Sequence, residues 1–394
     1  GIGRCGPSGL TRVKYLGETA KAGSYDIAGA IQALAAKGGP SPLRQALALF
    51  RLGYGRRKIR PEEYYTYALW RKDRDAAFLD QFLPNRRIRA FNGSLKMPGR
   101  GVADDAINDK ITTEAILTKR GLPVAATRAL YLGTSAPADL PALRLLRTAD
   151  DIAAFLSDPA NLPVFGKPRA DSFARGAAVI EGHGRPGTVR FLTGQEVPVA
   201  ALAAEIVQDW GQGYMFQPFY QCTPALRRHV GPAMASVRIV TLLTDQGVEP
   251  WYAVIRLPGK TAMHDGDADE TRIWGLIDIA TGQVTKLRNL RDPQSPDLTH
   301  GNDPEGVFLG FQMPDWDRAV DICRQAHDSF PGNGCIGWDV FLTEQGALLN
   351  EANGNPGHLY QVAAQRPLLN PDMRPGYDRA LAFARRHGGG IGAF

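Results

Sequence analysis

Residues 337–357 read GWDVFLTEQGALLNEANGNPG, and this stretch decides how the whole chain is interpreted. Two strand-like segments, GWDVFL and ALLNEAN, flank the turn-like residues TEQG, which is the pattern of a β-hairpin. If Glu344, Gln345 and Gly346 form a three-residue loop, Gly346 takes the left-handed conformation that such a loop needs. Residues whose numbers sum to 690 then lie opposite one another.

The predicted pairing brings two carboxylates face to face. Asp339 lies opposite Glu351, and Asn353 shares that face because side chains alternate along a strand. Opposed like charges destabilise a sheet, by about 3–4 kcal/mol at an effective dielectric of about 20, whereas Mg²⁺ seeks carboxylate and amide oxygens. The alternative is a solvated face with incidental acids. Phe341 and Leu349, paired on the same face, favour the floor of a cleft, so the sequence predicts that the acids are metal ligands.

A second hairpin is predicted within ASVRIVTLLTDQGVEPWYAVIRLPG, residues 235–259. With a loop at 245–247, Arg256 lies opposite Ser236, and Arg238 is its diagonal neighbour on the same face. Two guanidinium groups on one face of a sheet indicate an anion site, because arginine binds phosphate and carboxylate in a bidentate manner. The alternative is an acidic partner on another strand. The opposite face is predicted to be core, with Val237, Ile239, Trp251, Ala253 and Ile255.

Lysines form the third feature. VFGKPRADSFARGAAVI, residues 164–180, is a strand, a Lys-Pro pair, a small-polar turn and another strand. Lys167 can neutralise phosphates there, while N–H groups of the turn cradle them. The chain has no P-loop, and no strand is followed by a dinucleotide fingerprint. Taken alone, Lys110 in NDK is a surface lysine.

The rest of the chain divides into a helical part and a mixed part. Helical apolar spacing at 28–38 and 42–53 indicates helices, and RPEEYYTYALWRKDRDAAFLDQFLP (60–84) has the composition of one long helix that ends before its last proline. Beyond about residue 106, helices and strands alternate, and residues 235–290 are predicted to form antiparallel strands.

Taken in order, these pieces resemble the ATP-grasp superfamily. The matching elements are NDK with GLPV behind it (108–124), FGKP with a small-residue loop (165–176), YMFQPF (214–219), SVRIVT (236–241) and D-x11-E-x-N closed by Pro356. The phrases PEEYYTYALW, GWDVFLTE and NEANGNPG are similar to the sugar-transfer-associated ATP-grasp subgroup. The resemblance covers roughly residues 105–360.

The resemblance implies an α/β (α+β) fold in which two α/β subdomains grip ATP. It places a helical N-terminal domain at 1–105, a small subdomain with a lid loop at 106–215, and a large subdomain with the metal site at 216–394. Three departures are present. The lid loop SFARG has one glycine, the acid that often binds ribose is missing, with Gln221 as its substitute, and the loop around His264 is acidic.

The resemblance also implies a role for each candidate residue. Phosphate contacts would come from Lys110 and Lys167, and the lid at 172–176 would contribute Ser172, Phe173 and Gly176. The backbone of Gln217, Pro218 and Phe219 would receive adenine. One or two Mg²⁺ ions would bind Asp339, Glu351 and Asn353. The γ-phosphate, and the acyl phosphate it becomes, would be steadied by Arg238 and Arg256.

The implied activity is ATP-dependent ligation. ATP phosphorylates a substrate carboxylate, an amine attacks the acyl phosphate, and an amide, ADP and phosphate result. One alternative is a phosphotransferase that acts on a hydroxyl of a small molecule or sugar. Another is a nucleotide-binding module without turnover.

Composition limits the class of protein. The 394 residues carry a net charge of +6, with basic residues spread along the chain and no Lys/Arg block, which favours a small anionic ligand over nucleic acid. No apolar run is long enough to span a membrane, and GIGRCGPSGL lacks the apolar core of a secretory signal. Four scattered cysteines are typical of reduced thiols, so we expect a cytoplasmic protein. The oligomeric state stays open.

Overall fold

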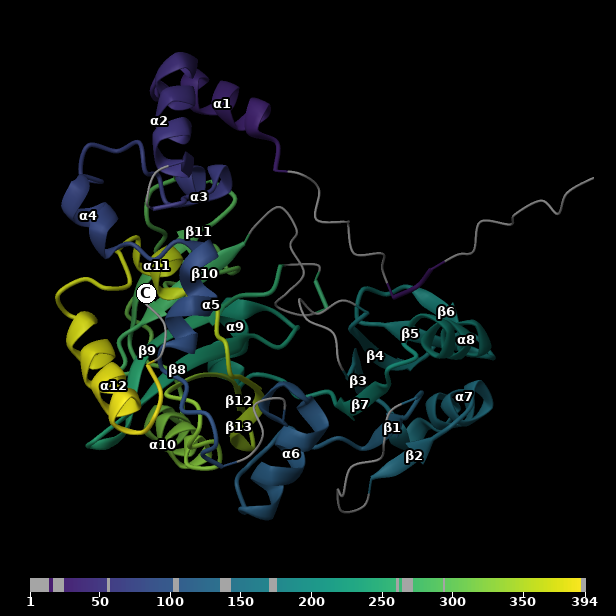
Figure 1. Ribbon diagram of the computed structural model, residues 1–394. Coiled ribbons are helices and arrows are strands. Elements are labelled where there is room, and N and C mark those ends of the chain that lie inside the picture. The colour runs from purple at the N-terminus through teal and green to yellow at the C-terminus, as the bar shows by residue number, and fades with distance from the viewer. Residues whose placement is uncertain are drawn as a thin grey trace, which may run out of the picture.

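The computed structural model describes residues 14–16, 25–54, 57–101, 106–134, 143–169, 176–259, 262–263, 272–292 and 295–390. It confirms the mixed α/β prediction, because two separate sheets are each flanked by helices (Figure 1). None of the helices in these ranges is long and apolar enough to cross a membrane.

The described part of the N-terminal region is helical, as predicted. Its helices are α1 (Ile27–Ala36), α2 (Pro42–Tyr54), α3 (Pro61–Thr66), α4 (Ala76–Gln81) and α5 (Asn85–Gly93). The prediction of a single long helix over 60–84 is wrong, because α3 and α4 are separate helices. Ala68 takes a left-handed conformation with φ +49°, and the Asp75 side chain accepts from Phe78 N at 2.9 Å to begin α4 anew.

The first sheet has seven strands in the order β2-β1-β7-β3-β4-β5-β6. Its strands are β1 (Ala129–Tyr131), β2 (Arg144–Leu146), β3 (Val164–Pro168), β4 (Ala178–His183), β5 (Thr188–Phe191), β6 (Glu196–Pro198) and β7 (Tyr214–Pro218). α7 (Ala149–Ser157) and α8 (Val199–Asp209) pack on it, and a capping box of Thr148 and Asp151 begins α7. The boundary expected between 215 and 216 falls within β7.

The second sheet has six strands in the order β11-β10-β9-β8-β12-β13. Its strands are β8 (Ser236–Thr244), β9 (Gly247–Arg256), β10 (Ile273–Ile277), β11 (Val284–Asn289), β12 (Cys335–Thr343) and β13 (Gly346–Asn353). These pairs are all antiparallel, as predicted. The remaining helices are η1 (Ala106–Asn108), α6 (Lys110–Lys119), η2 (Pro159–Asn161), α9 (Pro224–Val230), α10 (Trp316–His327), α11 (Tyr360–Ala364) and α12 (Arg374–Arg386).

The second sheet is covered on both faces by different parts of the chain. One face packs Val237, Ile239, Ala253 and Ile255 against α10 residues such as Ile322. On the other face Val240, Leu242, Tyr252 and Val254 pack with Tyr64, Phe91 and Tyr377, from α3, α5 and α12. We call this second cluster the N-terminal core. The helical N-terminal region and the arginine side of the sheet therefore share one face.

Trp251 lies in the N-terminal core, not on the α10 face where the alternation of β9 predicted it. The ladder between β8 and β9 shifts between Val240 and Thr241, which pair with Tyr252 and Pro250. Trp251 is the extra residue of this β-bulge, and a bulge reverses the alternation of side chains on its far side. The pairs nearer Arg256 keep the predicted register, with Arg256 opposite Ser236.

Candidate functional site

The hairpin of β12 and β13 sets the two carboxylates opposite each other, as predicted. Asp339 pairs with Glu351, and Gly337 pairs with Asn353. Gly346 has φ +99°, the left-handed conformation expected of it. The loop is shorter than predicted, however, because Thr343 pairs with Gly346.

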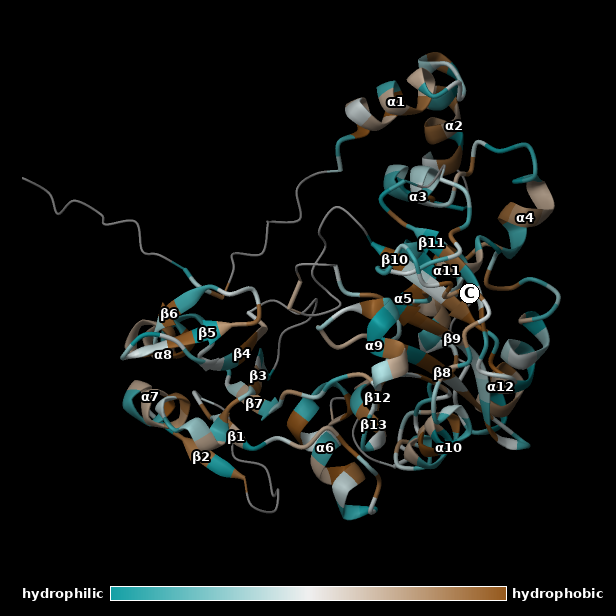
Figure 2. Cartoon of the chain, turned by 180° about the vertical axis from the view of Figure 1, so that it is seen from behind, coloured by the Kyte–Doolittle hydropathy of each residue, from teal (hydrophilic) through white to brown (hydrophobic). Residues whose placement is uncertain are grey.

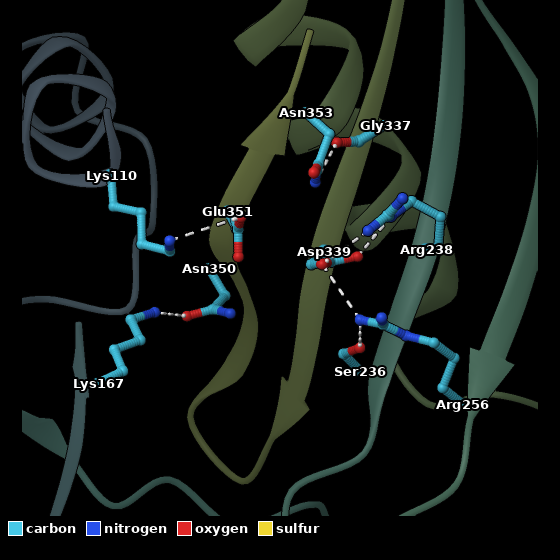
Figure 3. Close-up of polar contacts among 10 residues, drawn as sticks. All are labelled: Lys110, Lys167, Ser236, Arg238, Arg256, Gly337, Asp339, Asn350, Glu351 and Asn353. Carbon is cyan, nitrogen blue, oxygen red and sulfur yellow. Dashed lines mark hydrogen bonds and ion pairs between the residues drawn. The ribbon is translucent and has the colours of Figure 1, made fainter. Parts of the chain in front are cut away.

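A second β-bulge reconciles this short loop with the predicted pairing. Phe341 pairs with Leu348, not with Leu349 as predicted, and the ladder then shifts between Asp339 and Val340. The extra residue is Asn350, which the sequence analysis did not single out. Its Oδ1 accepts from Lys167 Nζ at 2.9 Å, so the bulge aims a polar group across to β3 (Figure 3).

Asp339 is paired with both predicted arginines. Arg238 Nε and Nη2 donate to its two oxygens at 2.5 and 2.9 Å, and Arg256 Nη2 donates at 3.2 Å. Burial alone would raise the pKa of Asp339, but the two guanidinium groups outweigh it and lower the pKa to about 2. The acidic partner considered as an alternative for the arginines is therefore present, and it is the predicted metal ligand itself. Arg256 also donates to Ser236 Oγ at 2.6 Å.

Glu351 meets a lysine from the other side of the site. Lys110 Nζ lies 3.9 Å from Glu351 Oε1 and donates to Arg169 O at 3.4 Å. Asn353 Nδ2 donates to Gly337 O at 3.3 Å. Repulsion between the opposed carboxylates is thus offset by protein cations, so it does not by itself require a metal ion, contrary to the argument from sequence.

Lys167 is buried, and its environment changes its acidity. Burial lowers the pKa of Lys167 to about 8, a change that Glu351 opposes and Lys110 reinforces. Glu114 on α6 also faces this charge, and burial raises the pKa of Glu114 although Thr127 donates to it. The ammonium is therefore mostly protonated at neutral pH and loses its proton at a lower pH than an exposed lysine does.

Lys110 is held in place by the start of its helix. It is the first residue of α6, and the Asp109 side chain caps that helix by accepting from Thr112 N at 2.8 Å. The other oxygen of Asp109 accepts from Arg169 Nε at 2.9 Å. This pair ties α6 to the residue that follows β3. The surface-lysine interpretation of Lys110 is wrong, since 9% of its side chain is exposed.

The site carries more positive than negative charge. Its cations are Lys110, Lys167, Arg238 and Arg256, and its carboxylates are Asp339, Glu351 and, beside Lys167, Glu114. These groups come from α6, β3, β8, β9, β12 and β13 (Figure 3). A partly buried surplus of cations attracts an anion with several negative charges.

The residues expected to receive adenine lie on and just after β7. Gln217 is buried, pairs with Phe165 in the sheet, and donates through Nε2 to Ala125 O at 2.6 Å. Pro218 pairs with Val164, and Phe219 N donates to Pro163 O at 3.4 Å. A small cavity beside Glu351 is lined mainly by apolar side chains, among them Leu117, Val124, Met215 and Leu349.

The structure describes only one of the three residues predicted to form the lid. Ser172 and Phe173 lie outside the described residues. Gly176 is described, with φ +68°, and a Cβ there would lie 2.2 Å from the Trp210 ring. Tyr214 Oη donates to Gly176 O at 2.7 Å, which fixes this end of the loop to β7.

A second set of polar residues, which was not predicted from the sequence, joins the N-terminal region to the site. Asn92 on α5 donates to Asn355 Oδ1 at 2.8 Å and to Pro356 O at 3.0 Å. His358 lies between Asn92 Oδ1 at 2.9 Å and Tyr252 Oη at 3.0 Å. Burial, helped by the charge of Arg238, lowers the pKa of His358 to about 3. A neutral imidazole therefore anchors the loop that follows Asn353.

The oxygen donors of this site fit a magnesium ion if a bound substrate supplies further oxygens. Among the described residues, no three His, Cys, Asp or Glu side chains gather as a metal site, and both oxygens of Asp339 accept from arginines. Glu351 and Asn353 remain oxygen donors at one edge. This partial set suits Mg²⁺, which commonly uses one or two carboxylates, waters and substrate phosphates.

The model of one protein family, described as sugar-transfer associated ATP-grasp, matches residues 102–372. That is more than half of the chain, and it includes all the site residues named above except Asn92. None of the curated proteins matches the chain in sequence.

Several solved structures are similar to the chain at low sequence identity. N5-carboxyaminoimidazole synthase from Aspergillus clavatus, solved with ADP and 5-aminoimidazole ribonucleotide, is 14% identical over 71% of this chain and 52% of that one, with a TM-score of 0.38. D-alanine-D-alanine ligase from Coxiella burnetii is 13% identical over 72% and 58%, with a TM-score of 0.35. VanG D-Ala:D-Ser ligase from Enterococcus faecalis is 14% identical over 72% and 62%, with a TM-score of 0.38. The chain spans about half the length of the first of these structures.

Proposed function

Because the chain belongs to the sugar-transfer-associated ATP-grasp family, we propose that it is an ATP-dependent, ADP-forming carboxylate–amine ligase. Its substrates are a small-molecule carboxylate and an amine. In the first step an oxygen of the carboxylate attacks the γ-phosphorus of ATP, and the bond to the ADP oxygen breaks. In the second step the amine nitrogen attacks the acyl carbon, phosphate leaves, and the amine proton passes to the released phosphate or to water.

The observation that carries this proposal is the cation surplus around Asp339 and Glu351. Lys110 and Lys167 reach the hairpin from α6 and β3, while Arg238 and Arg256 approach it from β8 and β9. This arrangement lets cations from four elements contact a triphosphate along its length, and a bound Mg²⁺ would offset more of its charge. Phosphoryl transfer depends mainly on such positioning and charge stabilisation.

Each side chain has a part in the proposed reaction. The two lysines bind the α- and β-phosphates, and the β7 backbone at 217–219 binds adenine. Arg238 holds Asp339 in place, and Arg256, which is more exposed than Arg238, contacts the γ-phosphate and then the acyl phosphate. Ser172, Phe173 and Gly176 belong to the proposed lid.

Magnesium has a defined place in the proposal. Glu351 and Asn353 would hold it, with Asp339 alongside, and it would offset the negative charge of the β- and γ-phosphates. Arg256 donates to Asp339 through a single contact at 3.2 Å, so it is the arginine that can leave Asp339 most readily.

A product assay tests the reaction. The full chain is incubated with MgATP and pooled amino acids, small carboxylates and amines, and ADP, AMP and free phosphate are measured together. ADP with equal free phosphate, produced only when both substrate classes are present, supports the ligase. ADP without free phosphate contradicts ligation and indicates a phosphotransferase, and absence of turnover with retained ATP binding indicates a binding module.

A further inference from the structure

Helix α2 carries apolar side chains on two opposite faces. Its inner face contributes Ala48, Leu49 and Leu52 to the edge of the N-terminal core. Its outer face bears Leu43, Leu47, Phe50 and Tyr54, which are 80%, 48%, 62% and 85% exposed. The inner face accounts for the folding of the helix, so the outer apolar face needs another explanation.

The four outer residues form one continuous stripe. They follow one another at spacings of four, three and four residues, which places them along a single side of a helix. The rings of Phe50 and Tyr54 touch, with centroids 4.9 Å apart. Single exposed apolar side chains are common on proteins, but a row of four large ones indicates a surface that interacts with a membrane or another protein. We call it the α2 stripe.

Positive charge is concentrated in the part of the chain that carries the α2 stripe. Residues 1–101 contain 19 lysines and arginines against 7 acids, whereas the remaining residues contain 27 against 33. The basic excess is thus confined to the N-terminal region, contrary to the even spread expected from the sequence. On α2 itself, Arg44 and Arg51 are the charged residues, and both are basic.

Two basic hollows lie along α2, one toward each end of the helix. Lys37, Arg44, Arg71 and Lys72 line one, beside the ring of Trp70. Arg51, Arg57 and Arg87 line the other, with a single acid, Asp80, that pairs with Arg57. Arg44 and Arg51 are seven residues apart and so lie on the same side of the helix, which means that the stripe is bordered along one flank by groups that attract phosphates.

We propose that the α2 stripe docks the protein on a bilayer that contains anionic lipid. The stripe enters the boundary between headgroups and acyl chains, and the basic hollows contact headgroup phosphates, as basic amphipathic helices do at membrane surfaces. In this arrangement α2 lies on the membrane surface.

Charge and shape favour this occupant over a protein. Pairing with a second copy through α2 would bring Arg44 and Arg51 of each chain close to like charges. α1 and α2 also stand out at one end of the molecule (Figures 1 and 2). A projecting helix meets a fluid bilayer without a matching groove, whereas a protein partner would have to provide one.

Vesicle flotation with the full chain tests the proposal. We expect binding to phosphatidylcholine vesicles that contain phosphatidylglycerol, and at least tenfold weaker binding to pure phosphatidylcholine vesicles. The double variant Leu47→Glu/Phe50→Glu should lose at least tenfold in binding. Val307→Glu, which removes a side chain that is 69% exposed elsewhere, should bind like the parent chain.

A second pair of variants separates charge from apolar contact. Arg44→Gln/Arg51→Gln should weaken binding to the anionic vesicles and flatten its salt dependence, while Arg318→Gln on α10 should change neither. Circular dichroism and thermal unfolding establish that each variant is folded.

Three results would overturn the proposal. The first is a folded parent chain that does not float with anionic vesicles. The second is equal loss of binding in Val307→Glu and in the double variant. The third is a dimer of the parent chain that the double variant converts to a monomer, without any binding to vesicles.

Discussion

At the residue scale, two carboxylates that face each other on one hairpin differ in role. Asp339 is buried and accepts from two arginines, whereas the Glu351 side chain is 30% exposed and lies 3.9 Å from one lysine. The sequence predicted both as metal ligands and did not distinguish them, because their difference comes from elements far apart in the chain.

Asp339 should therefore matter first for stability. Asp339→Asn leaves the guanidinium of Arg238 buried without its counter-ion, and we expect a loss of about 3–5 kcal/mol in the free energy of unfolding, measured with urea. The surface variant Asp321→Asn, which loses an exposed pair with Arg318 and can still accept from Gln325, should cost less than about 1 kcal/mol. Because its pKa is lowered in the folded state, Asp339 contributes fully above about pH 4, and the contribution is lost as pH falls toward 2. Equal costs for the two variants would contradict the structural role.

Glu351 should matter first for turnover. Glu351→Gln keeps the size of the side chain and removes its charge, so the proposed magnesium site loses its most accessible carboxylate. We expect ADP formation to fall by at least about 100-fold, with the urea midpoint nearly unchanged. Glu344→Gln, in the exposed turn of the same hairpin, is the matched control and should keep normal turnover. Unchanged turnover in Glu351→Gln would remove the residue from the metal site.

Lys167 predicts a pH dependence of nucleotide affinity. Its ammonium is charged below about pH 8 and neutral above it, so the affinity of the protein for ATP should fall about tenfold between about pH 7 and pH 9. Isothermal titration calorimetry measures this directly. Lys167→Arg stays charged over this range, and its affinity should be nearly independent of pH. The same slope in both proteins would show that another group controls binding.

At the element scale, the sequence predicted the residue pairs Asp339–Glu351 and Ser236–Arg256 correctly, but it did not predict the β-bulges that produce them. Gly346 was expected to take a left-handed conformation, and it does, with φ +99°. Gly247, in the loop of the second hairpin, has φ +97°. Each loop is one residue shorter than expected, and a bulge farther along the strand restores the predicted pairing. A bulge follows from side-chain packing against other elements, so the positions of Asn350 and Trp251 could not be obtained from alternation alone.

Helix α6 shows how one element positions one charge. Asp109→Ala removes both the cap of α6 and the ion pair with Arg169, and should cost about 1–2 kcal/mol in stability and weaken ATP binding. Asp109→Asn retains the cap, since asparagine caps helices as well as aspartate does, and should preserve most of the stability. Thermal unfolding and calorimetry measure the two effects. Equal losses in both variants would assign the effect to the ion pair instead of the cap.

At the scale of the whole molecule, the N-terminal helices and the second sheet share a core. The resemblance to the superfamily covered roughly residues 105–360, and the sequence left the role of residues 1–105 open. The structure places α3 and α5 on the same face of the sheet as Arg238 and Asp339. The proposed division at 105 therefore separates segments of the chain that share buried residues.

Phe91 on α5 tests whether these parts unfold as one unit. It is fully buried and stacks on Tyr377 at 4.4 Å between centroids, with Trp251 and His358 within 6.3 Å. Phe91→Ala should lower the free energy of unfolding by about 3–5 kcal/mol. If the core is shared, loss of ATP binding and loss of tryptophan fluorescence should shift together to lower urea concentration. A variant that loses structure in the N-terminal helices at low urea, yet binds ATP with normal affinity there, would instead show that the two parts are thermodynamically independent. Leu43→Ala on the exposed α2 stripe should leave both transitions where they are, because that side chain contributes little to the folded core.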